Sequence, residues 1–216
     1  MTTRERLDRD TVVTHATALA DREGLDAVTI RGLAADLGVT AMALYWHFKN
    51  KDELLDGVTE HLLSTVDTPA DHADWPDGLH AVVTAIVTAL RPHAALAPLV
   101  QRRILASEPG LRIVERSLGL LARGGFTAEE AAELSGYLLN AAVTLITAEP
   151  GSDGGTDPEQ RDAAARAKRA TLLTLAPGRY PHVIAAADPL TFCANGDAYY
   201  ARGVDLLIAG VRGLRP

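Results

Sequence analysis

The sequence predicts an all-α fold in which a small N-terminal unit of three helices is followed by a larger C-terminal helical unit. Three observations carry this prediction. Apolar residues recur at intervals of three and four along most of the chain, as on one face of a helix. Thr, Asp and Asn stand where helices would begin, and Gly and Pro stand where they would end. No segment alternates between polar and apolar residues as a half-buried strand does.

The composition is that of a soluble globular protein. The chain has 216 residues, of which 47% are hydrophobic and 23% charged, and both values are ordinary. Its longest uncharged apolar stretch, Leu134 to Ala148, is shorter than the roughly 18 residues that a membrane-spanning helix needs. The charged N-terminus lacks the apolar segment of a signal peptide, and the single cysteine, Cys193, permits no intramolecular disulfide. We therefore expect a cytoplasmic protein that does not enter a membrane.

The net charge argues against a protein that coats nucleic acid without selectivity. The chain carries a formal charge of −7 at pH 7. Residues 1–56 hold 7 Lys and Arg against 10 Asp and Glu, which gives −3. Any contact with nucleic acid must therefore depend on a local arrangement of positive groups.

The first two helices are predicted from the residues at their ends. Asp8 or Asp10 can accept hydrogen bonds from the free N–H groups at the start of the first helix. Gly24 can end this helix in a left-handed backbone conformation that costs glycine little. Thr29 then caps a short second helix, and Gly38 ends it.

Two further helices follow directly. Thr40 can cap a third helix of one or two turns that ends near Phe48. Asn50, with Glu53 three residues later, resembles a capping box, in which two side chains satisfy the free N–H groups of a helix start. This pattern predicts a fourth helix over residues 51–67.

A softer stretch, residues 68–76 (TPADHADWP), separates these helices from the C-terminal unit. Residues 151–158 (GSDGGTDP) and 175–183 (LAPGRYPHV) are expected to be irregular links. We divide the chain into a domain of residues 1–56, linked through the helix 51–67, and a domain of residues 57–216. The helices predicted in the second domain are 77–91, 96–106, 111–124, 127–149, 159–175 and 196–213.

The second and third helices have the layout of a helix-turn-helix. Ala34 is small and stands four residues before Gly38, and Val39 closes the corner. Leu44 and Phe48, four residues apart, form the inner face of the third helix. In a helix-turn-helix, this second member lies in the DNA major groove. The layout therefore predicts a DNA-binding domain.

The stretch LYWHFKNK, residues 44–51, supports this prediction. The chain is only 5% aromatic, yet Tyr45 to Phe48 are four consecutive ring-bearing residues. Adjacent helix residues point in different directions, so at least half of them must face outward. Small side chains at the helix start permit close approach to base edges, and the polar rings and lysines can bind phosphates. The residues expected at the DNA are Thr40, Ala41, Met42, Ala43, Tyr45, Trp46, His47, Lys49 and Lys51.

The stretch Thr29 to Leu55, TIRGLAADLGVTAMALYWHFKNKDELL, resembles the DNA-binding domain of TetR-family transcriptional repressors. The resemblance is specific over residues 9–57 and looser beyond, where Tyr199 to Leu214 is similar to the last helix of such proteins. It implies an all-helical homodimer that binds a palindromic operator and is released by a small-molecule effector. By residue match, it also implies that Thr29 and Arg31 open a helix that touches the DNA backbone and groove edge.

Two departures from the tetracycline-responsive members of this family are expected to matter. Ala41, Met42 and Ala43 stand where those members have residues that include a glutamine able to read a base. We therefore expect a different operator. The histidines and the asparagine of a tetracycline site have no convincing match in this chain, so we also expect a different effector, whose identity stays open.

The C-terminal unit offers several candidate effector-binding side chains. Tyr137, Asn140 and Thr144 lie on one face of an otherwise apolar helix, and buried amides and hydroxyls need hydrogen-bond partners. An effector can supply these partners, but so can neighbouring side chains or a second subunit. For the apolar residues of this helix, a buried core or a dimer interface is the plainer interpretation. The further candidates are His61, Thr65, His80, Thr84, Val87 and Arg103.

No pattern in the sequence predicts an enzyme, a metal site or a cofactor. No helix pairs histidines with a glutamate at zinc spacing, and no glycine-rich loop suits a nucleotide phosphate. One alternative is an enzyme or small-molecule carrier with an accessory helix-turn-helix, and turnover of a bound compound would distinguish it. Another is a constitutive DNA-binding structural protein without an effector, which a fully packed C-terminal domain would favour. The leading prediction is a ligand-responsive repressor whose partners are a double-stranded DNA operator, an unknown small-molecule effector and a second copy of the chain.

Overall fold

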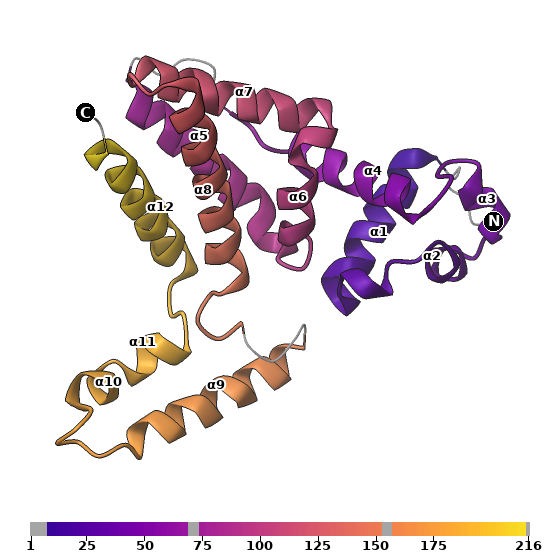
Figure 1. Ribbon diagram of the computed structural model, residues 1–216. Helices are drawn as coiled ribbons and strands as arrows, with labels where there is room; N and C mark the ends of the chain where they lie inside the picture. Colours follow the sequence, from indigo (N-terminus) through magenta and orange to yellow (C-terminus); the bar gives the residue numbers. More distant parts are fainter. Residues whose placement is uncertain (1–7, 69–73, 153–156, 215–216) are drawn as a thin grey trace.

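The computed structural model describes residues 8–68, 74–152 and 157–214. These residues form helices and connecting loops without a strand, which confirms the predicted all-α fold. Parts of the predicted boundary at residues 68–76 and of the predicted link at residues 151–158 lie outside the described residues. Figure 1 shows three regions, which are an N-terminal group of helices at one side, a central body, and a smaller helical group below the body.

The N-terminal group contains the predicted helix-turn-helix. Its helices are α1 (Arg9–Glu23), α2 (Ile30–Asp36) and α3 (Ala41–Tyr45), with a 3-10 turn, Leu25–Ala27, between the first two. α1 packs against α2, and α2 packs against α3. The fourth helix, α4 (Lys51–Ser64), packs against α1 at its start and leads from this group into the central body (Figure 1).

The central body is a helical bundle. Its helices are α5 (Trp75–Leu90), α6 (Ala97–Arg103), α7 (Glu108–Arg123), α8 (Ala128–Thr147) and α12 (Gly196–Gly213). α5 lies at the centre, because α7, α8 and α12 all pack against it, while α4 packs against α6 and α7. One cluster of buried apolar side chains runs from α1 through α4 into this bundle. The N-terminal group therefore rests on the body through a shared core.

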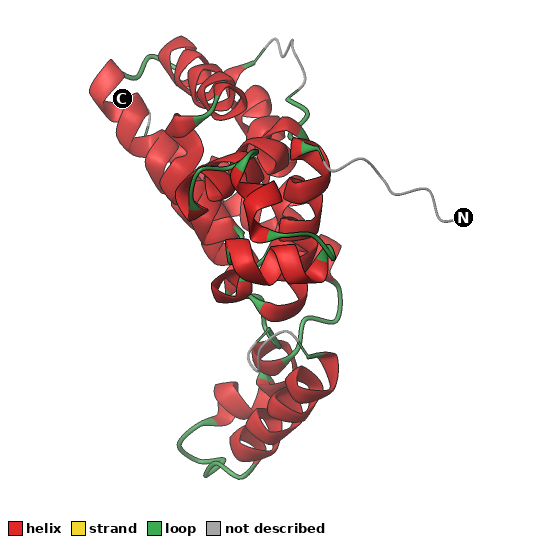
Figure 2. Cartoon of the chain, turned by 90° about the vertical axis from the view of Figure 1, so that its right-hand side faces the viewer, coloured by secondary structure: helices red, strands yellow, loops and turns green. Residues whose placement is uncertain are grey.

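The remaining helices form an arm. They are α9 (Pro158–Leu173), α10 (Pro181–Ala185) and α11 (Ala187–Thr191), and they pack mainly on one another. Both views show the arm below the body (Figures 1 and 2). The sequence did not predict α10 or α11. α10 begins inside the predicted irregular link because Pro181, whose backbone angle suits a first helical turn, occupies its first position.

The predicted N-terminal caps of the first helices are confirmed. Gly24 and Gly38 have φ angles of 85° and 64°, as expected for glycines that end a helix. The first helix begins after Asp8 rather than Asp10. A side-chain oxygen accepts a hydrogen bond from a backbone N–H of the first turn in α1, α2, α3 and α4, at 2.8, 3.0, 3.3 and 2.8 Å, from the capping residues Asp8, Thr29, Thr40 and Asn50.

The predicted capping box at the start of α4 is incomplete. Asn50 accepts the N–H of Glu53, but the Glu53 carboxylate does not return to Asn50. It accepts the N–H of Lys49 at 2.8 Å instead. The same carboxylate also pairs with Arg9 of α1 at 3.6 Å.

Some helix ends differ from their predicted positions. α4 ends at Ser64, because the N–H groups of Thr65 and Val66 turn back to carbonyls three residues earlier. α7 begins at Glu108, three residues before its predicted start, because Ser107 caps it at 3.3 Å. Only glycine fits at position 110 in this turn, because a β-carbon there would lie 1.8 Å from the carbonyl oxygen of Ile104.

α8 is less enclosed in the single chain than its apolar sequence suggests. Leu138, Ala142 and Ile146 are buried against the bundle. On the opposite side, Tyr137 is 65% exposed, and Asn140 is also exposed. α5, α6, α7 and α12 all pack against α8, but they leave this side of the helix open.

Candidate nucleic-acid interface and effector cavity

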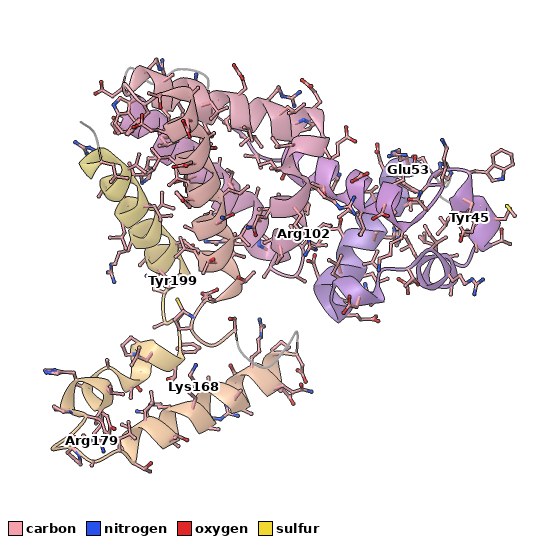
Figure 3. All side chains as sticks on the ribbon, in the orientation of Figure 1. Tyr45, Glu53, Arg102, Lys168, Arg179 and Tyr199 are labelled. Atoms are coloured by element: carbon pink, nitrogen blue, oxygen red, sulfur yellow. The ribbon has the colours of Figure 1, made fainter. Side chains whose placement is uncertain are left out.

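α3 presents its aromatic side chains to solvent from a firmly packed inner face. Leu44 and Phe48 are completely buried, whereas Met42, Tyr45 and Trp46 are 67%, 44% and 85% exposed. Figure 3 shows Tyr45 at the outer end of the N-terminal group. Large apolar side chains exposed on one short helix are typical of a binding surface.

The other predicted DNA-binding residues surround this helix. Thr29 and Thr40 use their hydroxyl oxygens to cap α2 and α3, which leaves each hydroxyl proton free to be donated to an acceptor on the DNA. Arg31, Lys49 and Lys51 are exposed. The side chains that are only half-buried are those of Ala41, Ala43 and His47.

Arg9 joins three elements behind this surface. Its guanidinium donates a hydrogen bond to the carbonyl of His47 at 3.0 Å and lies 4.3 Å from the centre of the Phe48 ring. It also pairs with Glu53. Arg9 therefore ties the end of the recognition helix to α1 and α4. Sequence reasoning missed this residue, because its first partner is 38 positions away and no local pattern links them.

The charge of Glu53 is stabilised in the same network. The N–H of Lys49 is the main cause that lowers the pKa of this carboxyl, against a smaller desolvation effect. The charges of Lys49 and Arg9 lower the pKa further. Glu53 is consequently a carboxylate that holds the turn between α3 and α4 in place.

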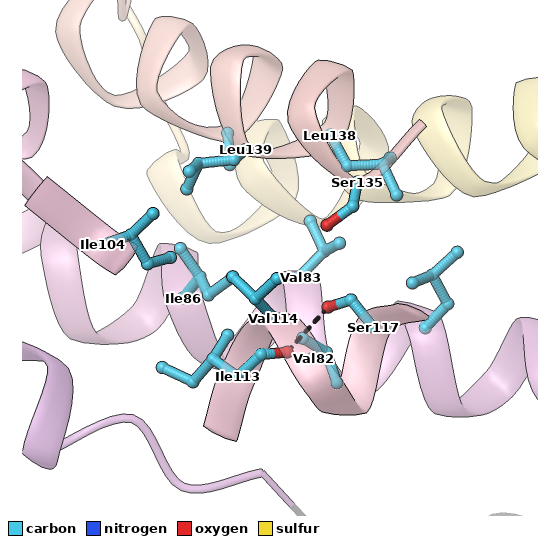
Figure 4. Close-up of a pocket in the computed structure, with 12 residues that line it drawn as sticks. Val82, Val83, Ile86, Ile104, Ile113, Val114, Ser117, Ser135, Leu138 and Leu139 are labelled. Carbon is cyan, nitrogen blue, oxygen red and sulfur yellow. Dashed lines mark hydrogen bonds between the residues drawn. The ribbon is translucent and has the colours of Figure 1, made fainter. Parts of the chain in front are cut away.

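The central body contains an apolar cavity between α5, α7 and α8, with Ile104 of the 3-10 turn Ile104–Ala106 in its wall (Figure 4). The volume of this cavity is only about 20 Å3. That is room for about one water molecule. The lining residues are Leu79, Val82, Val83, Ile86, Ile104, Ile113, Val114, Ser117, Ser135, Leu138, Leu139 and Ala142.

None of the nine predicted effector-binding residues lines this cavity. Three of them, Thr65, His80 and Thr84, lie together along an open surface hollow. His80 is already occupied, because one ring nitrogen lies 3.0 Å from Asp205 and the other 3.4 Å from the Thr84 hydroxyl. His61 is half-buried, and Val87 belongs to the buried core.

Tyr137, Asn140 and Thr144 do share a face of α8, as predicted, but that face points to solvent. Asn140 accepts a hydrogen bond from Gln101 at 2.6 Å. Thr144 donates to the Asn140 carbonyl at 2.9 Å. The polar groups of this face are thus partly satisfied within the chain, and a ligand is not needed to pair them.

Two polar bridges connect the N-terminal group to the body. Arg103 of α6 pairs with Asp56 and, at 2.7 Å, with Asp52, and both carboxylates lie on α4. His93 lies 2.7 Å from Asp21 of α1, and both side chains are 27% exposed. Arg103 is therefore already engaged by the DNA-binding unit.

The family of the chain follows from comparison with known proteins. Residues 12–58 match the family described as bacterial regulatory proteins, tetR family. Residues 68–215, more than half of the chain, match the tetracyclin repressor-like C-terminal domain. The chain belongs to the TetR family. The resemblance of residues 29–55 to this family is thereby confirmed and extended to the whole C-terminal unit.

Several TetR-family relatives span nearly the whole chain. The class C tetracycline repressor of Escherichia coli is 31% identical over 97% of this chain and 93% of its own length. The transcriptional repressor DrrR1 of Streptomyces coeruleorubidus is 30% identical over 96% of this chain and 80% of its own. The structure of ActR from Streptomyces coelicolor in complex with actinorhodin has a TM-score of 0.75 and 28% identity, covering 95% of each chain.

These TetR-family relatives are transcriptional regulators. The predicted function is confirmed at this level, because ligand-responsive repression by a dimer fits the family. Within the described residues, no helix is long and apolar enough to cross a bilayer. The same residues contain no group of three or more His, Cys, Asp or Glu side chains that could hold a metal ion.

Proposed function

We propose that this protein represses transcription as a homodimer bound to a palindromic operator, and that a small-molecule effector releases it. The observation that carries the proposal is α3 with the turn that follows it. Leu44 on the helix and Phe48 just after it are fully buried anchors, and the outer face is apolar, aromatic and exposed. In a helix-turn-helix dimer, two such helices enter successive major grooves about 34–36 Å apart. The operator is therefore expected to be an inverted repeat.

The proposed DNA contacts divide into two groups. Met42 and its small neighbours Ala41 and Ala43 face base edges, where apolar side chains contact the thymine methyl group. Thr40, at the start of the same helix, also faces bases. The contacts assigned to phosphates, sugars or groove edges are those of Thr29, Arg31, Tyr45, Trp46, His47, Lys49 and Lys51. The domain boundary near residue 56 is supported by α4, which packs against α1 on one side and α6 on the other.

The proposed dimer interface is the outer surface of α8 and α12. These two helices pack side by side at one edge of the body (Figure 1). Tyr137 on α8 and Leu206 on α12 are 65% and 74% exposed in the single chain. A second copy of the chain would bury both side chains. We therefore assign the face of Tyr137, Asn140 and Thr144 to the partner subunit rather than to the effector.

The proposed effector site is the apolar cavity of the body. Ile104 forms part of its wall, and the neighbouring residue Arg103 holds Asp52 and Asp56 of α4. A ligand that displaces Ile104 is expected to disturb this bridge and thus to change the position of the DNA-binding unit. Such coupling requires only that the effector binds the two arrangements with different affinity.

The proposal is tested by selecting bound sites from random duplex DNA with the purified protein. An enriched inverted repeat with half-sites one helical turn apart is the expected result, and Tyr45→Ala should reduce the enrichment. Failure to enrich any sequence, even at low salt, would refute operator binding. A repressor must reach the chromosome, so we also propose that the protein is located in the cytoplasm. Crosslinking the protein to the same inverted repeat in cells tests this location.

A further inference from the structure

The cavity of the body is lined almost entirely by apolar side chains. Ten of its twelve lining residues are aliphatic, and the other two are Ser117 and Ser135. No lining residue carries a charge or a titratable group. Moving an isolated charge from water into such surroundings is strongly unfavourable unless an opposite charge meets it. A charged group on a ligand would find no such partner here.

The two serines provide a polar point on each side of the cavity. Figure 4 shows Ser117 on α7 and Ser135 on α8 facing the space between them. Ser117 is buried, and its hydroxyl proton is donated to the carbonyl of Ile113 at 3.0 Å. Its oxygen therefore retains lone pairs that can accept one further hydrogen bond from a ligand. The Ser117 oxygen is thus suited to a ligand group that donates.

The cavity is nearly closed without a ligand. Its volume of about 20 Å3 is far below the roughly 300–1,000 Å3 that small-molecule pockets usually have. Val114 and Leu139 are only half-buried at its margin, so they can move outward at less cost than the fully packed residues. A ligand of modest size must enter by displacing such side chains.

We propose that the effector is a small, uncharged and mainly apolar molecule with a hydroxyl or N–H group that donates a hydrogen bond to the Ser117 oxygen. This inference rests on the proposed function for its biological role, but the binding itself can be tested alone. Charged ligands and metal chelates are excluded from this cavity by its lining.

The test uses three aromatic probes of one shape, which are naphthalene, 1-naphthol and 1-naphthoate, titrated calorimetrically into the full-length protein. 1-Naphthol should bind most tightly and naphthalene more weakly. 1-Naphthoate should bind at least tenfold more weakly than 1-naphthol. Ser117→Ala should weaken the binding of 1-naphthol about fivefold to tenfold, as expected for one buried hydrogen bond, and leave naphthalene unchanged.

Two variants keep this test specific. Val114→Phe adds a ring at the half-buried margin of the cavity, so it should block both neutral probes while the unfolding transition stays cooperative. Ser64→Ala removes an exposed serine whose hydroxyl also bonds a backbone carbonyl, that of His61 at 2.6 Å. This control variant should bind both neutral probes as tightly as the unaltered protein does. If Val114→Phe unfolds the chain, Ser117→Ala alone decides the result.

Several results would overturn the proposal. One is binding of 1-naphthoate as tight as that of 1-naphthol. Another is binding of the probes that is unchanged in both Ser117→Ala and Val114→Phe. A third is the absence of any probe binding by protein that still binds its operator, since the cavity would then be a packing imperfection only. That last outcome leaves the proposed function intact. Absence of operator binding with normal probe binding would instead refute the proposed function alone.

Discussion

Replacing Arg9 with alanine tests how the recognition helix is held. Arg9 is outside the proposed DNA surface, yet it donates to the His47 carbonyl at 3.0 Å, covers the Phe48 ring at 4.3 Å and pairs with Glu53 at 3.6 Å. All three partners lie at the junction of α3 and α4. Arg9→Ala is expected to loosen this junction and, with it, the orientation of Trp46.

The magnitude follows from the three contacts. A hydrogen bond from a charged donor is worth about 1.5 kcal/mol at the low end, an exposed cation–π contact about 0.5 kcal/mol, and an exposed ion pair about 0.2–1 kcal/mol. The Arg9 side chain is 45% exposed, so the low ends apply and the contributions overlap. We expect Arg9→Ala to lower the free energy of unfolding by about 1–2 kcal/mol and operator affinity by about tenfold.

The assay combines urea unfolding with operator binding at several salt concentrations. Arg22→Ala is the matched control, because Arg22 is exposed and paired with Asp36 and Glu23 on the far side of the same unit. It should change both quantities much less. Arg9→Lys should recover less than half of the loss, since a lysine lacks the planar fork that bonds a carbonyl and covers a ring at once.

The pH dependence gives a second measurement of the same network. Because the pKa of Glu53 is lowered in the folded chain, its contribution to stability is complete at neutral pH. It is lost only as the pH falls from the unfolded pKa through the lowered one. Glu53→Gln should therefore make the unfolding midpoint less sensitive to acid. The reasoning is refuted if Arg9→Ala leaves stability unchanged, or if it reduces the salt slope by about one, as loss of a phosphate contact does.

Three further predictions concern DNA and assembly. Met42→Ala should change base preference across a randomised operator library, whereas Tyr45→Ala and Lys51→Ala should weaken all sequences alike; an unchanged preference would mean that α3 is oriented differently. Operator affinity should fall only shallowly with salt, because the DNA-binding domain is not basic overall and neutralises few phosphates; a steep slope in binding isotherms would contradict this. Leu206→Glu should yield monomers by analytical ultracentrifugation, whereas Leu105→Glu, at a residue that is 64% exposed elsewhere, should leave the oligomeric state unchanged.

The sequence by itself determined the helices of the DNA-binding unit. Thr29, Thr40 and Asn50 cap them and Gly24 and Gly38 end them as predicted. These features can be predicted from the sequence because each depends on residues within one helical turn. The outward aromatic row followed from the same local geometry, since neighbours on a helix cannot all face inward.

The tertiary structure alone decided which side chains meet across the chain. The cavity gathers residues of α5, α7 and α8, and Arg9 finds partners 38 or more positions away. Arg103, one of the candidate effector-binding residues, pairs with α4, and its position in the sequence does not reveal which helix packs beside it. The apolar pattern of α8 likewise predicts that a face of this helix is covered. It does not show whether the same chain or a second copy of it covers that face. Local capping and periodicity act over a few residues, whereas packing depends on the relative placement of whole helices, and only the folded structure supplies that placement.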